Sequence, residues 1–420
     1  MFALAGLALI RAEAQHRTLL AEAAVAQKAG ELIRLVGKLE EARAMRPDYT
    51  RGLLLLARGY VANHRDADAI AILRELAAMG MALHLDEDKV LAGLQAQPGF
   101  KALQQAFLAN GAAHGSIEGE FSLPEQSGII EGMGRDAHGN WYFGDVRQHC
   151  LWRRETDGTL RRFSRPEDRL LGVFGLRVDG SAGVIWAGTA AAPEMDGYAA
   201  ADKGRSALVC FDLASGRVRQ TYPVPADGRD HLLGDVYLAA DGSVFASDSS
   251  APVIWRLAPG ANSLERWLES EDFVNLQGMT ASADGHSLIV ADYLSGLWQI
   301  SLADKSRRLL SAPPGTTLFG IDGLYAVPGG FVATQNGTDP LRVIHLTLDQ
   351  AGRPTQLRVL AAGQENLNDI SLGAVAGDRL FFVGNSGWAL FESPAVQPAP
   401  RPVHIMEVRI PAPSSPAPTR

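Results

Sequence analysis

A hairpin pattern that recurs towards the C-terminus constrains this fold more than any other feature of the sequence. It is clearest between Glu131 and Arg154, where a strand opening with Glu-Gly meets a His-Gly-Asn turn and returns as Trp-Tyr-Phe-Gly-Asp. Six segments share this arrangement and begin at Glu131, Phe174, Gly234, Gln277, Asp322 and Leu372. Sheet units that repeat every 40–60 residues or so are typical of β-propellers. The pattern therefore predicts a mainly β domain, a six-bladed β-propeller over residues 116–410.

The ends of the repeat array indicate how the ring closes. The last repeat offers strands at 372–376, 380–384 and 404–410 but no fourth strand after them. Because a propeller avoids a long unpaired edge, we expect residues 118–123, which precede the first repeat, to complete the last blade. Residues 411–420 are dominated by Pro, Ser and Ala and are expected to form a disordered tail.

The first 115 residues show no strand pattern and carry apolar residues at helical spacing. One window resembles a tetratricopeptide repeat, and shifts of about 34 residues in both directions reproduce its packing positions. These positions are Leu19, Ala23, Ala26, Leu35, Leu39 and Ala42, then Leu53, Leu56, Ala57, Tyr60, Ala69, Leu73 and Leu76, then Leu91, Leu94, Leu103 and Phe107. We expect residues 1–115 to form an α-helical, tetratricopeptide-like arm. It either binds a protein partner or packs against the propeller.

The bulk properties exclude some partners and leave the compartment open. With 420 residues the chain can build two cores, and its net charge of −8 argues against nucleic-acid binding. No apolar run is long enough to span a bilayer. Residues 1–14 are either a signal remnant that ends at Ala14 or the start of an amphipathic helix, so periplasmic, secreted and cytoplasmic locations all remain open. Cys150 and Cys210 lie in apolar strands and are expected to be buried.

The hairpin arithmetic places polar residues at one mouth of the propeller channel. Antiparallel pairing around each turn sets the opening residue of a repeat opposite the end of its second strand. The expected pairs are Glu131 with Asp145, Asp235 with Asp248, Gln277 with Asp292, Asp322 with Gln335 and Asn336, and Leu372 with Asn385. The longest insertion, Ala190–Ser206, falls at the same mouth and is a candidate lid.

Two interpretations of this polar ring are open. Oxygen ligands arriving from several directions suit a hard cation such as calcium, and clustered carboxylates repel one another unless a cation or a proton intervenes. Alternatively, the channel holds only water, and the acids at the ends of the second strands hydrogen-bond the turn into the next strand. Trp152, Trp255 and Trp298 recur at equivalent third-strand positions, which packing between blades explains.

Residues 118–410 resemble the senescence-marker-protein/gluconolactonase family. The likeness rests on the opening Glu131-Gly with its following D-x-x-G-x-x-Y-F-x-D, and on RVDGSAGVIWAGT and SADGHSLIVADYLSGLWQI. It implies a divalent metal at the channel mouth and hydrolysis of sugar lactones. Of the implied ligands Glu131 matches, whereas the expected Asn falls on Gly234 and the expected Asp on Gln277. Asp322 or Asp235 would then substitute.

These observations lead to two functional hypotheses. The first is a metal-assisted hydrolase of a small lactone or ester at the propeller mouth, in which a divalent cation (Ca, Mn or Zn) polarises the carbonyl group and an acid activates water. Its predicted residues are the metal ligands Glu131, Gln277 and Asp322, the catalytic acids Asp322 and Asp235, and the substrate-binding residues Asp145, Asp248, Asp292, Asn336 and Asn385. The second hypothesis is a non-catalytic scaffold in which the arm and the propeller each present a binding surface.

Overall fold

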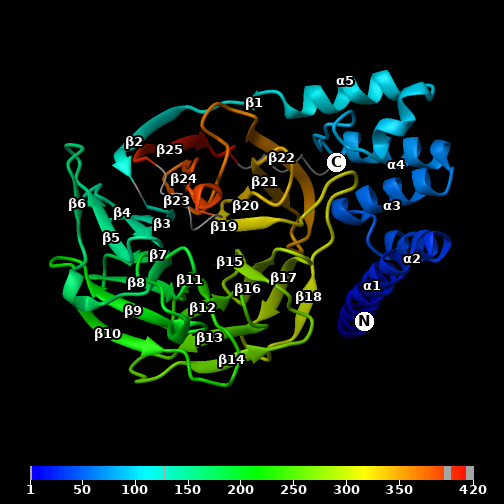
Figure 1. Ribbon diagram of the computed structural model, residues 1–420. Helices are drawn as coiled ribbons and strands as arrows, with labels where there is room; N and C mark the ends of the chain where they lie inside the picture. The colour runs from blue at the N-terminus through cyan, green and yellow to red at the C-terminus, as the bar shows by residue number, and fades with distance from the viewer. Residues whose placement is uncertain (1, 127, 392–398, 413–420) are drawn as a thin grey trace, which may run out of the picture.

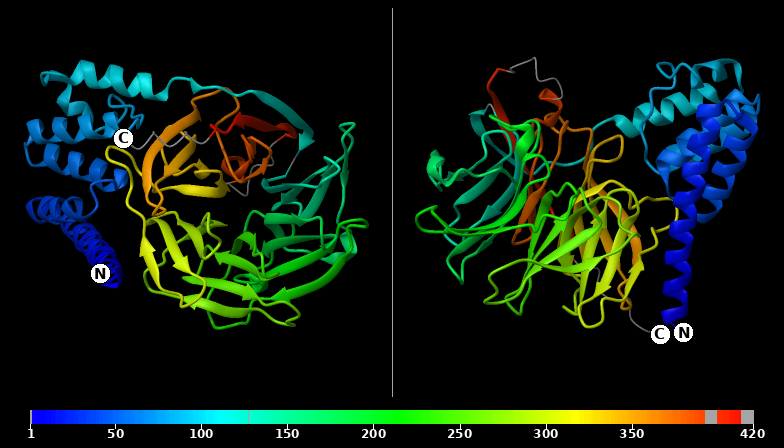
Figure 2. Two further views of the ribbon diagram at one scale, coloured as in Figure 1. Left: turned by 180° about the vertical axis from the view of Figure 1, so that it is seen from behind. Right: turned by 60° about the horizontal axis from the view of Figure 1, so that its bottom comes forward.

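The computed structural model describes residues 2–126, 128–391 and 399–412 of the chain, and it shows a wheel of six sheets with a helical arm beside it (Figure 1). The six-bladed propeller and the helical region before it are confirmed. The arm lies next to the fourth and fifth blades, on the outside of the wheel (Figure 2).

Each of the first four blades is a four-stranded antiparallel sheet whose innermost strand comes first in the chain. The first blade contains β3 (Ile130–Arg135), β4 (Trp141–Asp145), β5 (Cys150–Arg154) and β6 (Leu160–Arg162). The second contains β7 (Gly172–Asp179), β8 (Val184–Ala190), β9 (Ser206–Asp212) and β10 (Val218–Pro223). The third contains β11 (Leu233–Leu238), β12 (Val244–Asp248), β13 (Val253–Leu257) and β14 (Glu265–Glu269). The fourth contains β15 (Leu276–Ala281), β16 (Ser287–Asp292), β17 (Gly296–Ser301) and β18 (Arg307–Leu309).

The last two blades use strands from both ends of the propeller sequence. The fifth contains β19 (Ile321–Val327), β20 (Gly330–Gln335), β21 (Arg342–Leu348), β22 (Pro354–Ala362) and the edge strand β1 (His114–Gly115). The sixth contains β23 (Gly373–Ala376), β24 (Arg379–Val383), β25 (Arg401–Arg409) and, as its outermost strand, β2 (Gly119–Gln126). The predicted closure of the ring is therefore confirmed. The two residues of β1 fall at the end of the range predicted to be helical, and they instead pair with β22. Of the expected tail, residues 413–420 lie outside the described part of the chain.

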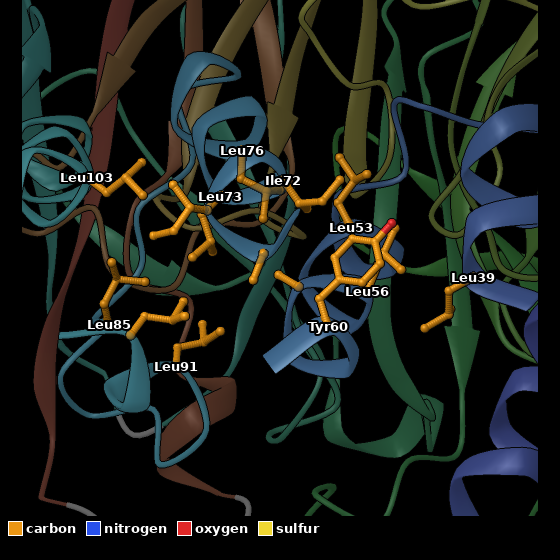
Figure 3. Close-up of a cluster of buried hydrophobic side chains, with 14 of the residues drawn as sticks. Leu39, Leu53, Leu56, Tyr60, Ile72, Leu73, Leu76, Leu85, Leu91 and Leu103 are labelled. Carbon is orange, nitrogen blue, oxygen red and sulfur yellow. The ribbon is translucent and has the colours of Figure 1, made fainter. Parts of the chain in front are cut away.

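The arm consists of α1 (Phe2–Ala29), α2 (Leu32–Met45), α3 (Thr50–Ala62), α4 (Asp66–Ala78), the 3-10 helix η1 (Leu91–Ala96) and α5 (Phe100–Gly111). Every apolar position taken from the repeat alignment is buried, and those of α3, α4 and α5 meet in one core (Figure 3). The third pair begins with a 3-10 helix, which agrees with its weaker match to the repeat. None of the helices in the described residues has the length and apolar character needed to cross a membrane.

Arg46 fastens the arm to the propeller. Its guanidinium group pairs with Glu13 of α1 and with Asp48, donates a 3.0 Å hydrogen bond to the main-chain oxygen of Ser295, and lies 4.5 Å from the ring centre of Phe319. The guanidinium group thus touches three regions of the chain that are distant in sequence. A second contact comes from the buried side chain of Arg342, whose Nη1 lies 3.4 Å from the main-chain oxygen of Met79 at the end of α4. Charge-assisted contacts of this kind hold the arm in one orientation.

The innermost strands carry an irregularity that changes the predicted register. In the first blade Ile130, not Glu131, pairs with Asp145, because a β-bulge lies between Ile130 and Met133. The same shift recurs in blades two to five, so that Asp248, Asp292 and Gln335 face Leu233, Leu276 and Ile321. In the sixth blade the partner of Asn385 is Asp369 rather than Leu372.

Candidate functional site

The bulges bring the opening residues of the blades to the channel. An extra residue in one strand re-aims the side chains next to it, and the residue after Glu131, Gln277 or Asp322 is a glycine. A Cβ on Gly132 would lie 2.3 Å from the main-chain oxygen of Phe174, and one on Gly278 would lie 2.4 Å from that of Asp322. Glycine is required because the inner strands of neighbouring blades approach this closely. The Glu-Gly, Gln-Gly and Asp-Gly pairs are therefore the local cause of the ring of polar side chains.

Three carboxyl groups share one region of the mouth: Glu131 of β3, Asp322 of β19 and Asp369, which precedes β23. Burial raises the pKa of Glu131 well above its usual range, and the charges of Asp322 and then Asp369 raise it further. The indole Nε1 of Trp388 donates a 2.5 Å hydrogen bond to Oε2 of Glu131, which opposes that rise in pKa. Asp369 accepts a 2.7 Å hydrogen bond from the main-chain N–H of Gly387. We call Glu131, Asp322 and Asp369 the carboxyl cluster.

Asp322 is the buried acid that the fifth blade contributes to the cluster. Burial raises the pKa of Asp322 to about 7, the charges of Asp235 and Asp369 contribute, and a 2.8 Å hydrogen bond from Nδ2 of Asn336 opposes them. The same amide nitrogen of Asn336 also donates to the main-chain oxygen of Ile370. Asn336 therefore orients Asp322 from the neighbouring strand. A carboxyl group with a pKa near 7 can both accept and release a proton under ordinary conditions.

Asp235 lies one residue further along its inner strand and is paired with a cation. Nη2 of Arg177 from β7 donates a 2.9 Å hydrogen bond to Oδ2 of Asp235, which also accepts one from the main-chain N–H of Met279. Burial raises the pKa of Asp235, whereas the positive charge of Arg177 lowers it. Arg177 also lies 5.6 Å from the ring centre of Tyr325. Blades two, three, four and five thus meet at this ion pair, and Oδ1 of Asp235 is buried without a hydrogen-bond partner.

The predicted metal ligands do not assemble into a metal centre. Nε2 of Gln277 donates to Asn275, and one oxygen of each carboxyl group, Glu131 and Asp322, already accepts a hydrogen bond from protein. Within the described ranges no group of three or more His, Cys, Asp or Glu side chains is arranged to hold a metal ion. Calcium takes six to eight oxygens, water included, and these two acids and one amide provide few of them; they also include none of the His or Cys ligands common at zinc sites. The donor set present does not fit the implied cation.

Four of the predicted substrate-binding residues instead hold their own blades together. Oδ2 of Asp248 accepts a hydrogen bond of 3.0 Å from the indole of Trp255 and contacts Nδ1 of His231 at 2.6 Å, while Oδ1 accepts three main-chain N–H groups. Asp145 receives the indole N–H of Trp152 in the same way. Asp292 accepts three main-chain N–H groups, and Asn385 binds the main chain of β25 on both sides of its amide. Of the five predicted residues, Asn336 donates a side-chain hydrogen bond to an acid of the carboxyl cluster, and Asn385 meets the cluster through its main-chain bridge to Asp369.

A short segment before the last strand covers part of the mouth. Residues 386–391, which include the 3-10 helix η4 (Trp388–Leu390), carry Trp388 to Glu131. The ring of Trp388 lies 6.1 Å from that of Phe174, the bulge residue of the second blade. The insertion Ala190–Ser206, expected to be a lid, packs beside this region, because Arg147 pairs with Asp196 at 2.6 Å and lies over the ring of Phe391.

The arm reaches the rim of the mouth through α3. The guanidinium group of Arg51 lies 5.7 Å from the ring centre of Tyr293. Burial raises the pKa of Tyr293, the charge of Asp322 raises it further, and the charge of Arg51 lowers it. Tyr293 therefore stands between a residue of the arm and the carboxyl cluster.

Sequence reasoning missed Asp369, Arg177 and Trp388. Asp369 belongs to an Asn-Asp pair just before an inner strand, and such a pair is a usable signal, since polar residues at that place face the mouth. Arg177 could be found only by counting past the bulge. Trp388 lies in a connection with no repeat and no period, so nothing in the pattern marks it.

Comparison with known proteins finds only distant similarities in shape. No protein-family model matches the chain, and no curated protein matches it. Solved structures with a similar shape include a gluconolactonase-like protein, at 18% identity over 69% of this chain and 93% of that one, with a TM-score of 0.45. They also include the PQQ-bound aldose sugar dehydrogenase of Streptomyces coelicolor (11%, 71% and 99%, 0.48) and a luciferin-regenerating enzyme (15%, 70% and 98%, 0.48). At these identities the likeness concerns the fold alone.

Proposed function

We propose that this protein is a hydrolase of a small lactone or ester and that its active site is the carboxyl cluster at the channel mouth. The observation that carries the proposal is that half-buried Glu131 and buried Asp322 lie at one mouth, where the charge of Asp322 raises the pKa of Glu131 and the pKa of Asp322 is raised as well. Keeping uncompensated acids in a buried place destabilises a fold, and pairs of acids whose pKa values are driven apart are typical of acid–base catalysis.

The two acids supply complementary steps of hydrolysis. Ionised Asp322 accepts a proton from a water molecule while the water oxygen attacks the carbonyl carbon of the substrate. Protonated Glu131 donates its proton to the ring or ester oxygen when the carbon–oxygen bond breaks, so that an alcohol and a carboxylic acid form. Asp322 then holds a proton taken from water and Glu131 is ionised, and transfer of that proton from Asp322 to Glu131 restores the starting state. Water is the only co-reactant, and the protons balance.

The remaining residues of the site orient these two acids. Asn336 donates a hydrogen bond to one oxygen of Asp322, and the Arg177–Asp235 ion pair connects the second and third blades beside it. We assign Asp235 a supporting role rather than that of the base, because its charge is already compensated by Arg177. A divalent cation, Ca, Mn or Zn, held by Glu131, Gln277 and Asp322 would relieve the same repulsion. The donor set does not gather in the required number, and no step is assigned to such an ion.

A panel of small aliphatic lactones and aryl esters tests this function. We expect Asp322→Asn and Glu131→Gln each to lower kcat/KM at least about 100-fold, the lower limit typical of a lost acid or base. The matched control is Glu365→Gln, which removes an exposed carboxyl group from the loop that carries Asp369. Full activity of either site variant, or no turnover of any substrate by the wild type, would reject the assignment.

Calorimetric titration with Ca²⁺, Mn²⁺ and Zn²⁺ distinguishes a site that works with two acids alone from a site that binds a metal ion. We expect no binding to the wild type at millimolar concentration. Metal binding to the wild type that disappears in Glu131→Gln would show that a metal ion, and not a proton, relieves the repulsion between the acids. The metal-assisted form of the hydrolase would then be the better assignment. Loss of turnover without any metal effect would support the acid pair.

A further inference from the structure

The described segment at residues 386–391, which we call the cap segment, is attached to two of the three acids of the carboxyl cluster. Trp388 donates to Oε2 of Glu131 at 2.5 Å, and the main-chain N–H of Gly387 donates to Oδ2 of Asp369 at 2.7 Å. The main chain of Ser386 exchanges further hydrogen bonds with Ile130 and Asp369, at 3.1 and 2.8 Å. Four bonds thus bind a segment of six residues to the mouth.

The backbone of the cap segment depends on glycine at one point. Gly387 has φ of 112°, a conformation that residues with a side chain rarely adopt. A Cβ at this position would also lie 2.2 Å from Nη2 of Arg401. This turn directs the next residue, Trp388, back over the channel, where the indole meets Glu131.

Apolar packing fixes the indole ring from the other side. The cluster around it joins the first, second and sixth blades and consists of Ile129, Val146, Phe174, Ala190, Ala192 and Phe391, with Leu232 and Trp388 packed against it. The ring plane of Trp388 is inclined by 32° to that of Phe174. Since an aromatic side chain has only two rotatable bonds, such packing leaves the N–H group little freedom.

The hydrogen-bonding chemistry of the indole determines which oxygen of Glu131 can carry a proton. An indole nitrogen can only donate a hydrogen bond, so Oε2 of Glu131 must present a lone pair to it. A proton on Glu131 is then carried by Oε1. We propose that Trp388 is a positioning residue of the proposed hydrolase: its N–H group occupies Oε2 of Glu131 and leaves Oε1 as the oxygen that delivers the proton to the substrate. This inference rests on the proposed function, and Trp388 itself need not touch the reacting atoms.

Trp388→Phe removes the N–H group and keeps an aromatic ring in the apolar cluster. A hydrogen bond to a charged group is worth about 1.5–3 kcal/mol, so we expect kcat to fall about 10- to 100-fold while KM changes less than about twofold. Trp388→His, which retains a ring N–H, should recover part of kcat. The matched control is Trp186→Phe, between the second and third blades, where kcat should not change. An unchanged kcat in Trp388→Phe, or a change in KM alone, would overturn the proposal.

A second measurement is independent of turnover. In protein labelled with ¹⁵N-tryptophan, the seven indole N–H groups give separate signals, and the signal missing from Trp388→Phe identifies Trp388. We expect Glu131→Ala to move this signal upfield, whereas Glu365→Ala leaves it in place. A signal that does not respond to Glu131→Ala would remove the contact and the proposal with it. If the signal moves but no lactone or ester is turned over, the hydrolase assignment fails and the contact stands.

Discussion

The carboxyl group of Asp322 in the fifth blade raises the pKa of Glu131 in the first blade, although the two residues are separated in the wheel by the whole sixth blade. The sixth blade contacts the first blade directly at this point, since Ser371 and Leu372 both donate hydrogen bonds to the main-chain oxygen of Glu131. Asn336 on the other side donates to Ile370. The segment that leads into the sixth inner strand is thus bonded to the first blade at Glu131 and to the fifth blade at Asn336. These bonds hold the two blades, and with them the two acids, at a short distance.

The stability of the protein should depend on the ionisation of Asp322. Because burial raises its pKa to about 7, the folded state binds this proton more tightly than the unfolded state does. The stabilisation is complete below the usual pKa of an aspartate and is lost as pH rises through about 7. We expect the difference in free energy of unfolding between wild type and Asp322→Asn to change by roughly 4 kcal/mol at most between pH 4 and pH 8. Urea unfolding across this range measures it, and a pH-independent difference would contradict the prediction.

Asp248 should matter for stability and not for turnover. Its carboxylate satisfies three main-chain N–H groups and an indole inside the third blade. Asp248→Ala leaves those buried donors without an acceptor, and we expect a loss of roughly 3 kcal/mol or more in the free energy of unfolding. Activity per folded molecule should remain. The control is Asp230→Ala, where an exposed pair with Lys203 contributes about 1 kcal/mol or less. A loss of activity without a loss of stability in Asp248→Ala would return this residue to the site.

Gly278 should be intolerant of a side chain. A methyl group there would lie 2.4 Å from the main-chain oxygen of Asp322, so Gly278→Ala must push the fourth and fifth blades apart. We expect about 1–3 kcal/mol of destabilisation, typical of overpacking, together with reduced turnover because Asp322 moves. Thermal unfolding and activity are measured beside Gly180→Ala, where no atom lies within 4 Å of the new methyl group. Equal behaviour of the two variants would show that the bulge has no role in positioning Asp322.

Arg46 should determine whether the arm stays attached. Its replacement by Ala takes the guanidinium group away from buried Glu13, which keeps only the contact with His16, and removes the bond to Ser295, so we expect a loss of about 3–5 kcal/mol. Arg34→Ala, at an exposed pair with Glu31, is the control. Limited proteolysis should release the arm of Arg46→Ala before the propeller is cut. Protection equal to that of the wild type would mean that Arg342 and β1 suffice to hold the arm.

The sequence by itself determined the number of blades, the strand that closes the ring and the helical packing positions. These are properties of pattern: each strand and helix repeats its apolar positions with its own period, and local turns such as the one at Gly139 are encoded in adjacent residues. Packing of the blades explains the recurrence of Trp152 and Trp255, because both side chains belong to their apolar clusters. Their indoles donate hydrogen bonds to Asp145 and Asp248, and the spacing between the aspartate and the tryptophan is the same in both blades. The sequence therefore contains a signal for these hydrogen bonds.

Only the tertiary structure decided which acids face the channel. A bulge inserts one residue into the inner strands of the first five blades, and a shift of one residue exchanges the two faces of a strand. Counting from the turns therefore placed Asp145 and Glu131 together, whereas Asp145 belongs to the interior of its blade and Glu131 to the mouth. Asp369 and Trp388 reach the mouth through connections that have no period. Their positions follow from how neighbouring blades pack, because the close approach of main chains at Gly132 and Gly278 fixes where each blade begins, and no local pattern records that distance.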